Sequence, residues 1–174
     1  RSVMAVMAVT PVVFSSAFAA DNLSSQKLVD ADLVLESQST SITGGDVIVT
    51  SEVDAEGNPL FSFKLQNNQY LPNSSEDNLL KLTSFEANGL KIVDITGNKI
   101  NKEDESVYPD LRNGFLHSAT ATRFTDNVAV NVCNNSIEYT AVERAVEGAA
   151  LGGTVYFDGN TTIIHNENKA IVES

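Results

Sequence analysis

The side chains of this chain that could carry out catalysis are few. It contains one cysteine and two histidines, His117 and His165. Nucleophilic hydrolysis requires a Ser, Cys or Thr beside a positioned base, and the Gly-x-Ser-x-Gly nucleophile elbow is absent. His117 shares its parity with Phe115 and Ala119 in a strand-like segment, and His165 follows another such segment. Both patterns are typical of structural or surface histidines, so we predict no catalytic residue and no enzyme activity.

Cys133 is the only cysteine, so it cannot form a disulfide within the chain. It falls on the parity of the polar residue Asn131 rather than on that of Val130 and Val132. We interpret it as an ordinary strand residue. The alternative is an intermolecular disulfide or a reactive thiol.

Carboxylate and amide side chains recur between Asp94 and Glu105. Hard cations such as Ca²⁺ prefer oxygen ligands of this kind. A regular EF-hand loop is excluded because Lys99 stands where the loop requires glycine. A less regular Ca²⁺ site formed by Asp94, Asn98, Asp104 and Glu105 is a candidate, and a solvated acidic loop is the alternative. No other cofactor is predicted.

The composition restricts the partners. The chain has 11 Lys and Arg against 23 Asp and Glu, which gives a net charge of −12 and a pI of about 4.4. Nucleic acid is excluded as a partner because phosphate binding depends on clustered basic residues. A glycan remains a candidate, although the chain lacks Trp and its tyrosines form no recognisable platform in the sequence.

Residues 1–19 have the pattern of a secretory signal peptide. Arg1 precedes an uncharged run rich in Val, Met, Ala and Phe, and Ala17 and Ala19 are small residues of the kind that signal peptidase recognises. Cleavage before Ala20 predicts a secreted protein, extracellular or at the cell surface, without a stable membrane anchor. The alternative is a retained apolar N-terminal segment, because an uncharged run of about 19 residues can just cross a bilayer.

Several short segments alternate apolar and polar residues, which is typical of half-buried strands. Residues 46–50 and 60–65 are expected to form a hairpin around the turn-forming residues 54–59, and residues 154–164 a second hairpin around Asp158-Gly159. No internal repeat is found, and the polar residues 98–113 are interpreted as a long surface loop. These patterns predict a mainly β fold, an antiparallel β-sandwich or jelly-roll-like domain over residues 37–174.

One short helix is expected at about residues 140–151. Thr140 can cap its N-terminus, and Gly152-Gly153 can end it. Between them, apolar residues recur at helical spacing: Val142, Ala145, Val146 and Ala149. We expect this helix to pack on the sheets.

Residues 20–36 suggest how the chain could be used. They begin polar and then alternate, which suits an N-terminal arm that inserts into a neighbouring copy; the alternative is that they form the first strand of their own domain. The candidate assembly residues are Leu28, Val29, Ala31, Leu33 and Leu35. The resulting hypothesis is a secreted structural subunit that self-assembles by β-strand addition into a pilus-like or matrix filament. The alternative is a secreted module that binds Ca²⁺ or carbohydrate.

Overall fold

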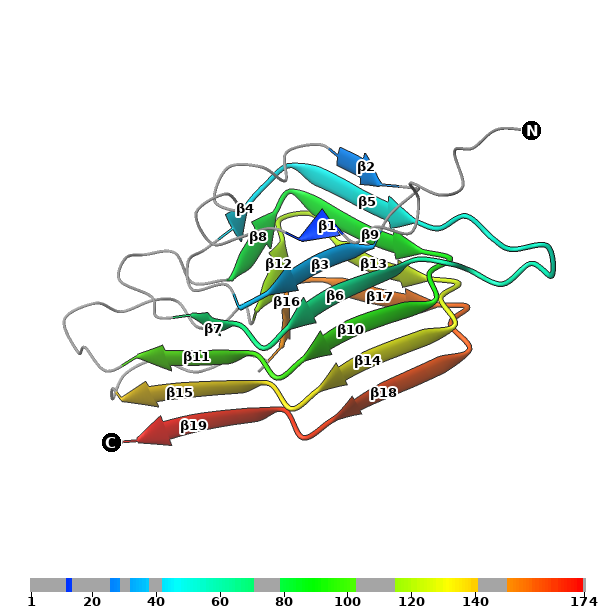
Figure 1. The fold of residues 1–174 in the computed structure, drawn as a ribbon. Helices are drawn as coiled ribbons and strands as arrows, with labels where there is room; N and C mark the ends of the chain where they lie inside the picture. Colours follow the sequence, from blue (N-terminus) through cyan, green and yellow to red (C-terminus); the bar gives the residue numbers. More distant parts are fainter. Residues whose placement is uncertain are drawn as a thin grey trace.

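The strands of this chain stack in parallel. The computed structural model describes residues 12–13, 26–28, 32–37, 42–70, 79–102, 115–140 and 150–173. Paired residues lie a full turn of the chain apart, as Val93 shows by pairing with Phe63 on one side and with Val130 on the other. The chain therefore winds into a parallel β-solenoid in which each coil contacts the coils before and after it (Figure 1).

Four parallel sheets form the walls of the solenoid. Sheet A contains, in order, β1 (Val12–Val13), β3 (Leu33–Glu36), β6 (Ser62–Gln66), β10 (Ile92–Thr96), β14 (Ala129–Cys133) and β18 (Thr162–Asn166). Sheet B contains β7 (Gln69–Tyr70), β11 (Lys99–Lys102), β15 (Ser136–Thr140) and β19 (Lys169–Glu173). Sheet C contains β4 (Ile42–Thr43), β8 (Leu80–Leu82), β12 (Leu116–Ser118) and β16 (Leu151–Gly152). Sheet D contains β2 (Gln26–Leu28), β5 (Asp46–Thr50), β9 (Ser84–Asn88), β13 (Thr122–Thr125) and β17 (Val155–Asp158).

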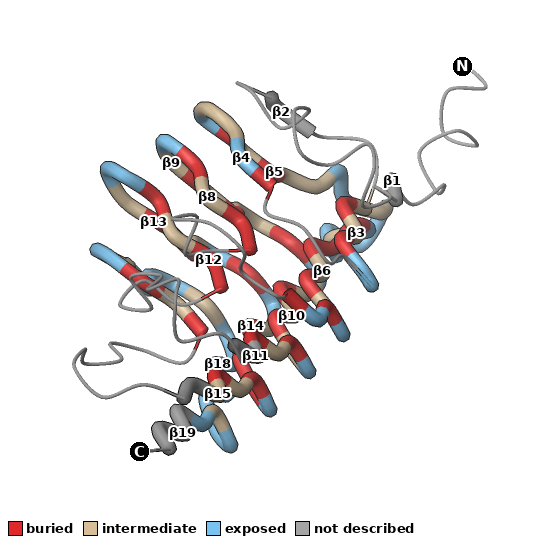
Figure 2. Tube along the Cα trace, turned by 90° about the vertical axis from the view of Figure 1, so that its left-hand side faces the viewer, coloured by how far each residue is buried: buried red, intermediate tan, exposed pale blue. Residues whose placement is uncertain are grey.

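The core lies inside the coils, because residues at the same register position form inward-facing columns. One column of sheet A has four fully buried members: Leu33, Phe63, Val93 and Val130. A column of sheet D has three more: Val49, Ala87 and Phe124. Figure 2 shows buried segments alternating with exposed corners from one coil to the next. Stacking thus buries apolar side chains that no single coil could bury alone.

The predicted antiparallel β-sandwich is wrong. β5 and β6 do not pair with each other: β5 pairs in parallel with β9, and β6 pairs in parallel with β10. The Asp158-Gly159 pair likewise joins β17 to β18 at a corner, and these strands pair with β13 and β14. A two-residue alternation is common to parallel and antiparallel strands, so it identified strands without identifying their partners.

Two further expectations need correction. No helix is present in the described ranges: Thr140 ends β15 and Leu151 begins β16, while residues 141–149, which carry the expected apolar stripe, lie outside them. The predicted surface loop at residues 98–113 contains β11 at its start, and its remainder from residue 103 lies outside the described ranges. β11 pairs in parallel with β7 and β15, and these strands satisfy its backbone hydrogen bonds. The polar composition of the segment gave no sign of this pairing.

A ladder of asparagines holds the corner between sheets A and B: Asn68, Asn98, Asn135 and Asn168. Asn98 Nδ2 donates to the Leu65 carbonyl oxygen at 2.8 Å and to Asn135 Oδ1 at 2.9 Å. Each member follows a residue with positive φ, namely Asn67, Gly97, Asn134 and Glu167. This corner is the internal repeat that sequence inspection missed, because the members lie 30, 37 and 33 residues apart and share little beyond the asparagine.

One loop interrupts the first coil between β5 and β6, where an isolated antiparallel bridge joins Val53 to Pro59 (Figure 1). Inside it, the backbone N–H of Asn58 donates to the Asp54 carboxylate at 2.8 Å, and that of Glu56 does so at 2.9 Å. The hydrogen bond from the Asn58 backbone is the main cause that lowers the pKa of Asp54 below its ordinary value of 3.8. The loop is therefore a closed turn of fixed shape.

Candidate functional site

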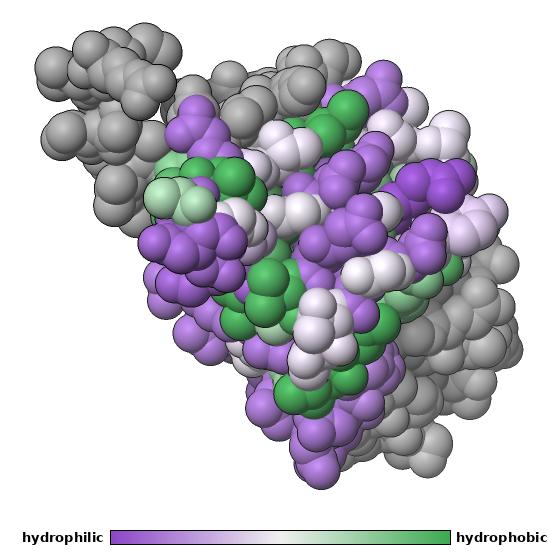
Figure 3. Space-filling model, turned by 90° about the vertical axis from the view of Figure 1, so that its right-hand side faces the viewer, coloured by the Kyte–Doolittle hydropathy of each residue, from purple (hydrophilic) through white to green (hydrophobic). Residues whose placement is uncertain are grey.

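The last coil that the structure describes, formed by β16, β17, β18 and β19, leaves part of the core uncovered. Ile163 continues the inward column of Val130, yet it is 47% exposed, whereas Val130 is fully buried. Phe157 continues the column of Phe124 and is 40% exposed. The two phenylalanine rings lie 5.2 Å apart between centroids. Hydrophobic surface is visible toward this lower end of the molecule in Figure 3.

The backbone of the last coil is also open. Within the described residues, β16, β17, β18 and β19 are the final strands of sheets C, D, A and B, and each pairs on one side only. The asparagine ladder stops there as well: the backbone N–H of Asn135 donates to Asn168 Oδ1, but that of Asn168 has no acceptor in the described part of the chain. A second pair of asparagines, at the corner between sheets D and A, ends in the same way: the backbone N–H of Asn127 donates to Asn160 Oδ1, and that of Asn160 has no acceptor among the described residues. Such an edge can accept a further strand that runs in the same direction.

The opposite end is covered in part by the N-terminal segments. β1 pairs in parallel with the first two residues of β3, Val12 with Leu33 and Val13 with Val34. β2 pairs with Val47–Val49 of β5. Of the predicted assembly residues, Leu33 and Leu35 are fully buried in β3, which pairs with β6 of the same chain. Leu28 ends β2, and Val29 and Ala31 lie outside the described residues. In the structure this stretch therefore belongs to its own solenoid.

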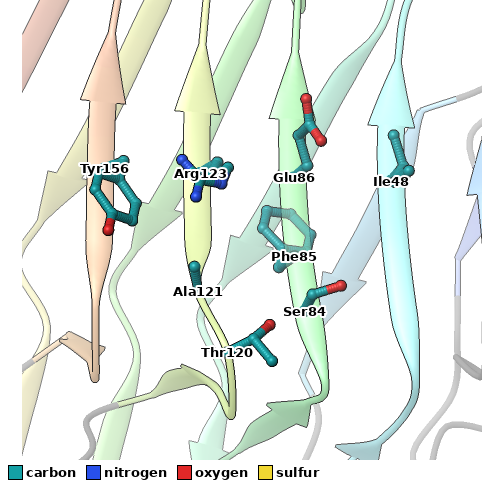
Figure 4. A pocket seen from close by; sticks show the side chains of 8 residues that line it. All are labelled: Ile48, Ser84, Phe85, Glu86, Thr120, Ala121, Arg123 and Tyr156. Carbon is teal, nitrogen blue, oxygen red and sulfur yellow. The ribbon is translucent and has the colours of Figure 1, made fainter.

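A row of side chains crosses the outer face of sheet D. Ile48, Glu86, Arg123 and Tyr156 stand at one register position on β5, β9, β13 and β17 (Figure 4). They line a shallow, open depression of about 330 Å³, together with Ser84, Phe85, Thr120 and Ala121. The Arg123 guanidinium carbon lies 4.2 Å from the centroid of the Tyr156 ring, a cation–π contact.

The predicted Ca²⁺ ligands are not brought together by the described residues. Asp94 stands on the outer face of β10, where its Oδ2 accepts a hydrogen bond from Gln66 Nε2 at 2.7 Å. Asn98 is 1% exposed and its side chain belongs to the buried ladder. Asp104 and Glu105 lie outside the described ranges. Among the described residues, no group of three or more potential metal ligands is found.

Of the remaining candidates for chemistry, His117 lies on one wall, and Cys133 and His165 lie on neighbouring strands of another. His117 is on β12 of sheet C, and His165 is exposed on β18 of sheet A. Cys133 is buried, and its Sγ lies 3.7 Å from the Ile164 carbonyl oxygen. Of the residues that line the depression, Tyr156 is one of the four tyrosines that form no recognisable platform in the sequence, and none was predicted to bind a ligand. Glu86, Arg123 and Tyr156 become neighbours through strand pairing, which leaves no local pattern to recognise.

Comparisons of the chain with protein-family models, curated proteins and solved structures found no match. In the part of the chain that the structure describes, no helix has the length and apolar character needed to span a membrane.

Proposed function

We propose that this chain is a secreted structural subunit that self-assembles end to end by β-strand addition. The observation that carries the proposal is the uncovered last coil, where Ile163 and Phe157 are exposed in columns whose other members are buried. Placing another coil on this end would bury both side chains and contribute roughly 1 kcal/mol for each. The added coil would also provide backbone hydrogen-bond partners for the unpaired edges of the terminal strands.

The natural occupant is the first coil of a second copy. Once residues 1–19 are removed, its β3 begins the inward column of sheet A, with Leu33 ahead of Phe63, and its edge strand in sheet D is β2, which pairs with β5. These strands run parallel to the strands that they would join, so a copy stacked head to tail preserves the direction of pairing. A contact between two different ends of identical subunits is heterologous, and copies stacked along the axis of the solenoid would extend into an open filament rather than close into a ring.

The end face also contains a polar residue. His165 continues the inward column of Leu35, Leu65, Ile95 and Val132. A neighbouring coil would cover this imidazole, which can be buried in its neutral form at lower cost than in its charged form. The joint is therefore expected to combine apolar contacts with strand pairing.

The test is a charge placed at the joint. In a chain that begins at Ala20, we expect Ile163→Asp to abolish concentration-dependent oligomers, because a carboxylate would be buried between coils. The matched control is Ile164→Asp: Ile164 is 42% exposed on the same strand but continues the outward column of Asn131. Analytical ultracentrifugation and negative-stain microscopy provide the readout, with circular dichroism to confirm folding. A wild-type chain that stays monomeric, or two variants that assemble alike, would contradict the proposal.

A further inference from the structure

We infer that the outer face of sheet D binds an uncharged glycan in the depression around Arg123. This site lies on the outer face of a side wall, whereas the end-to-end joint uses inward columns; the two share the terminal strand β17, which carries Tyr156. The argument rests on the row that crosses four strands, Ile48, Glu86, Arg123 and Tyr156. The residues of the row differ in chemistry, and their order is what suggests the ligand.

The centre of the row offers directed hydrogen bonding. Arg123 is paired in register with Glu86, so a guanidinium with several donors stands beside a carboxylate with several acceptors. Among the described residues, neither group makes a hydrogen bond or an ion pair with another side chain, which leaves both for a ligand. Adjacent hydroxyl groups on a sugar ring can both donate to a carboxylate and accept from a guanidinium.

The flanks of the row offer apolar surface. Tyr156 lies on one side of the charged pair and Ile48 on the other, and Tyr156 is 47% exposed (Figure 4). The contact between Arg123 and the Tyr156 ring holds the guanidinium in place, which reduces the entropy lost when a ligand binds. Aromatic and aliphatic surfaces next to directed polar groups match the alternating C–H and O–H faces of a sugar.

The charges favour an uncharged ligand. Arg123 and Glu86 cancel each other within the row, and the chain as a whole carries a net charge of −12. An acidic polysaccharide would be repelled by the overall charge and by Glu86, while a cationic ligand would meet Arg123. A neutral oligosaccharide lying across the strands meets neither penalty.

The experiment is a calorimetric titration of the chain with neutral oligosaccharides, namely cello-, xylo-, manno- and malto-oligosaccharides, with oligogalacturonate as the acidic comparison. We expect saturable binding of at least one neutral series and none of oligogalacturonate. Arg123→Ala should weaken that binding roughly 10- to 100-fold, since it removes charge-assisted hydrogen bonds. Tyr156→Phe should retain it, because the ring surface remains.

The matched control is Lys91→Ala, which removes one exposed positive charge outside the row. It should bind as the unmodified chain does. Absence of binding to every neutral series, binding confined to oligogalacturonate, or equal weakening by Arg123→Ala and Lys91→Ala would each overturn the inference. Assembly can be scored on the same samples, so that failure of this site is distinguished from failure of the end-to-end joint.

Discussion

Asn98 illustrates how one side chain can hold neighbouring coils together. Its Oδ1 accepts from the backbone N–H of Asn68 at 3.2 Å and from Asn68 Nδ2 at 2.7 Å, while its Nδ2 reaches the Leu65 carbonyl and Asn135. All the hydrogen-bonding groups of this buried amide are used. A satisfied polar network of this kind specifies the stacking register, because a coil that slipped would leave buried groups without partners.

We expect Asn98→Ala to destabilise the fold by about 3 kcal/mol, since buried groups on Asn68 and Leu65 would lose their partner. Asn131→Ala is the control: Asn131 lies on the outer face of the neighbouring strand β14, and its change should cost under about 1 kcal/mol. Urea unfolding followed by circular dichroism measures both. Equal stability of the two variants would show that the ladder does not hold the coils together.

Among the strands, β1 occupies a position that would matter for the proposed assembly. It pairs with Leu33 and Val34 on the side of β3 that would otherwise face a neighbouring copy. Val12 and Val13 fall within residues 1–19, the predicted signal peptide. If this segment is removed on export, the edge of β3 is freed at the same time. Removal of the predicted signal peptide and the proposed assembly would then follow one another, with assembly after secretion.

The expected result is that the chain of residues 1–174 assembles at a concentration roughly 10-fold higher than the chain of residues 20–174, because β1 competes for the edge of β3. Only oligomers that disappear when Ile163→Asp is introduced are counted in each chain. This subtraction removes oligomers formed by non-specific association of the apolar residues 1–19. Val12→Pro in the longer chain removes a backbone donor from β1 and should restore part of the assembly. Identical behaviour of the long and short chains would mean that β1 does not guard the edge.

The charge of the molecule would set the ionic conditions under which the proposed assembly occurs. Each copy carries a net charge of −12, or −13 without Arg1 when it begins at residue 20, so stacked copies would repel one another over the distance at which their charges remain unscreened. The proposed end-to-end contact would be short-ranged and mainly apolar, so salt would weaken it little. Ionic strength should therefore act on the repulsion more than on the contact itself.

Association of the chain from residue 20 is expected to strengthen by about 10-fold or more as NaCl rises from 0.01 to 0.15 M, since the screening length falls from about 30 to about 8 Å. Sedimentation velocity at each concentration of salt measures the effect. MgCl₂ and CaCl₂ at equal ionic strength should act alike. A larger effect of CaCl₂ would instead point to a specific Ca²⁺ site, and no dependence on salt would contradict the role of repulsion.

The local sequence was sufficient to locate many of the strands. The predicted segment at residues 46–50 coincides with β5, and the segment at residues 60–65 overlaps β6. Alternation of apolar and polar residues follows directly from the two-residue period of a strand, so it can be read without knowing the partner. Asp158-Gly159 does interrupt the strands, and Gly159 has positive φ, but the pair forms a corner between β17 and β18 rather than the expected hairpin turn.

The partners of those strands depended on contacts between residues about 30 or more positions apart. β6 ignores the adjacent β5 and pairs with β10, and Arg123 meets Glu86 and Tyr156 only through the same kind of stacking. The open end of the solenoid cannot be predicted from the sequence either, since Ile163 and Val130 are both apolar residues of strand-like segments. Burial and pairing depend on the stacked coils together, and the sequence of a single strand does not specify which strands lie on either side of it.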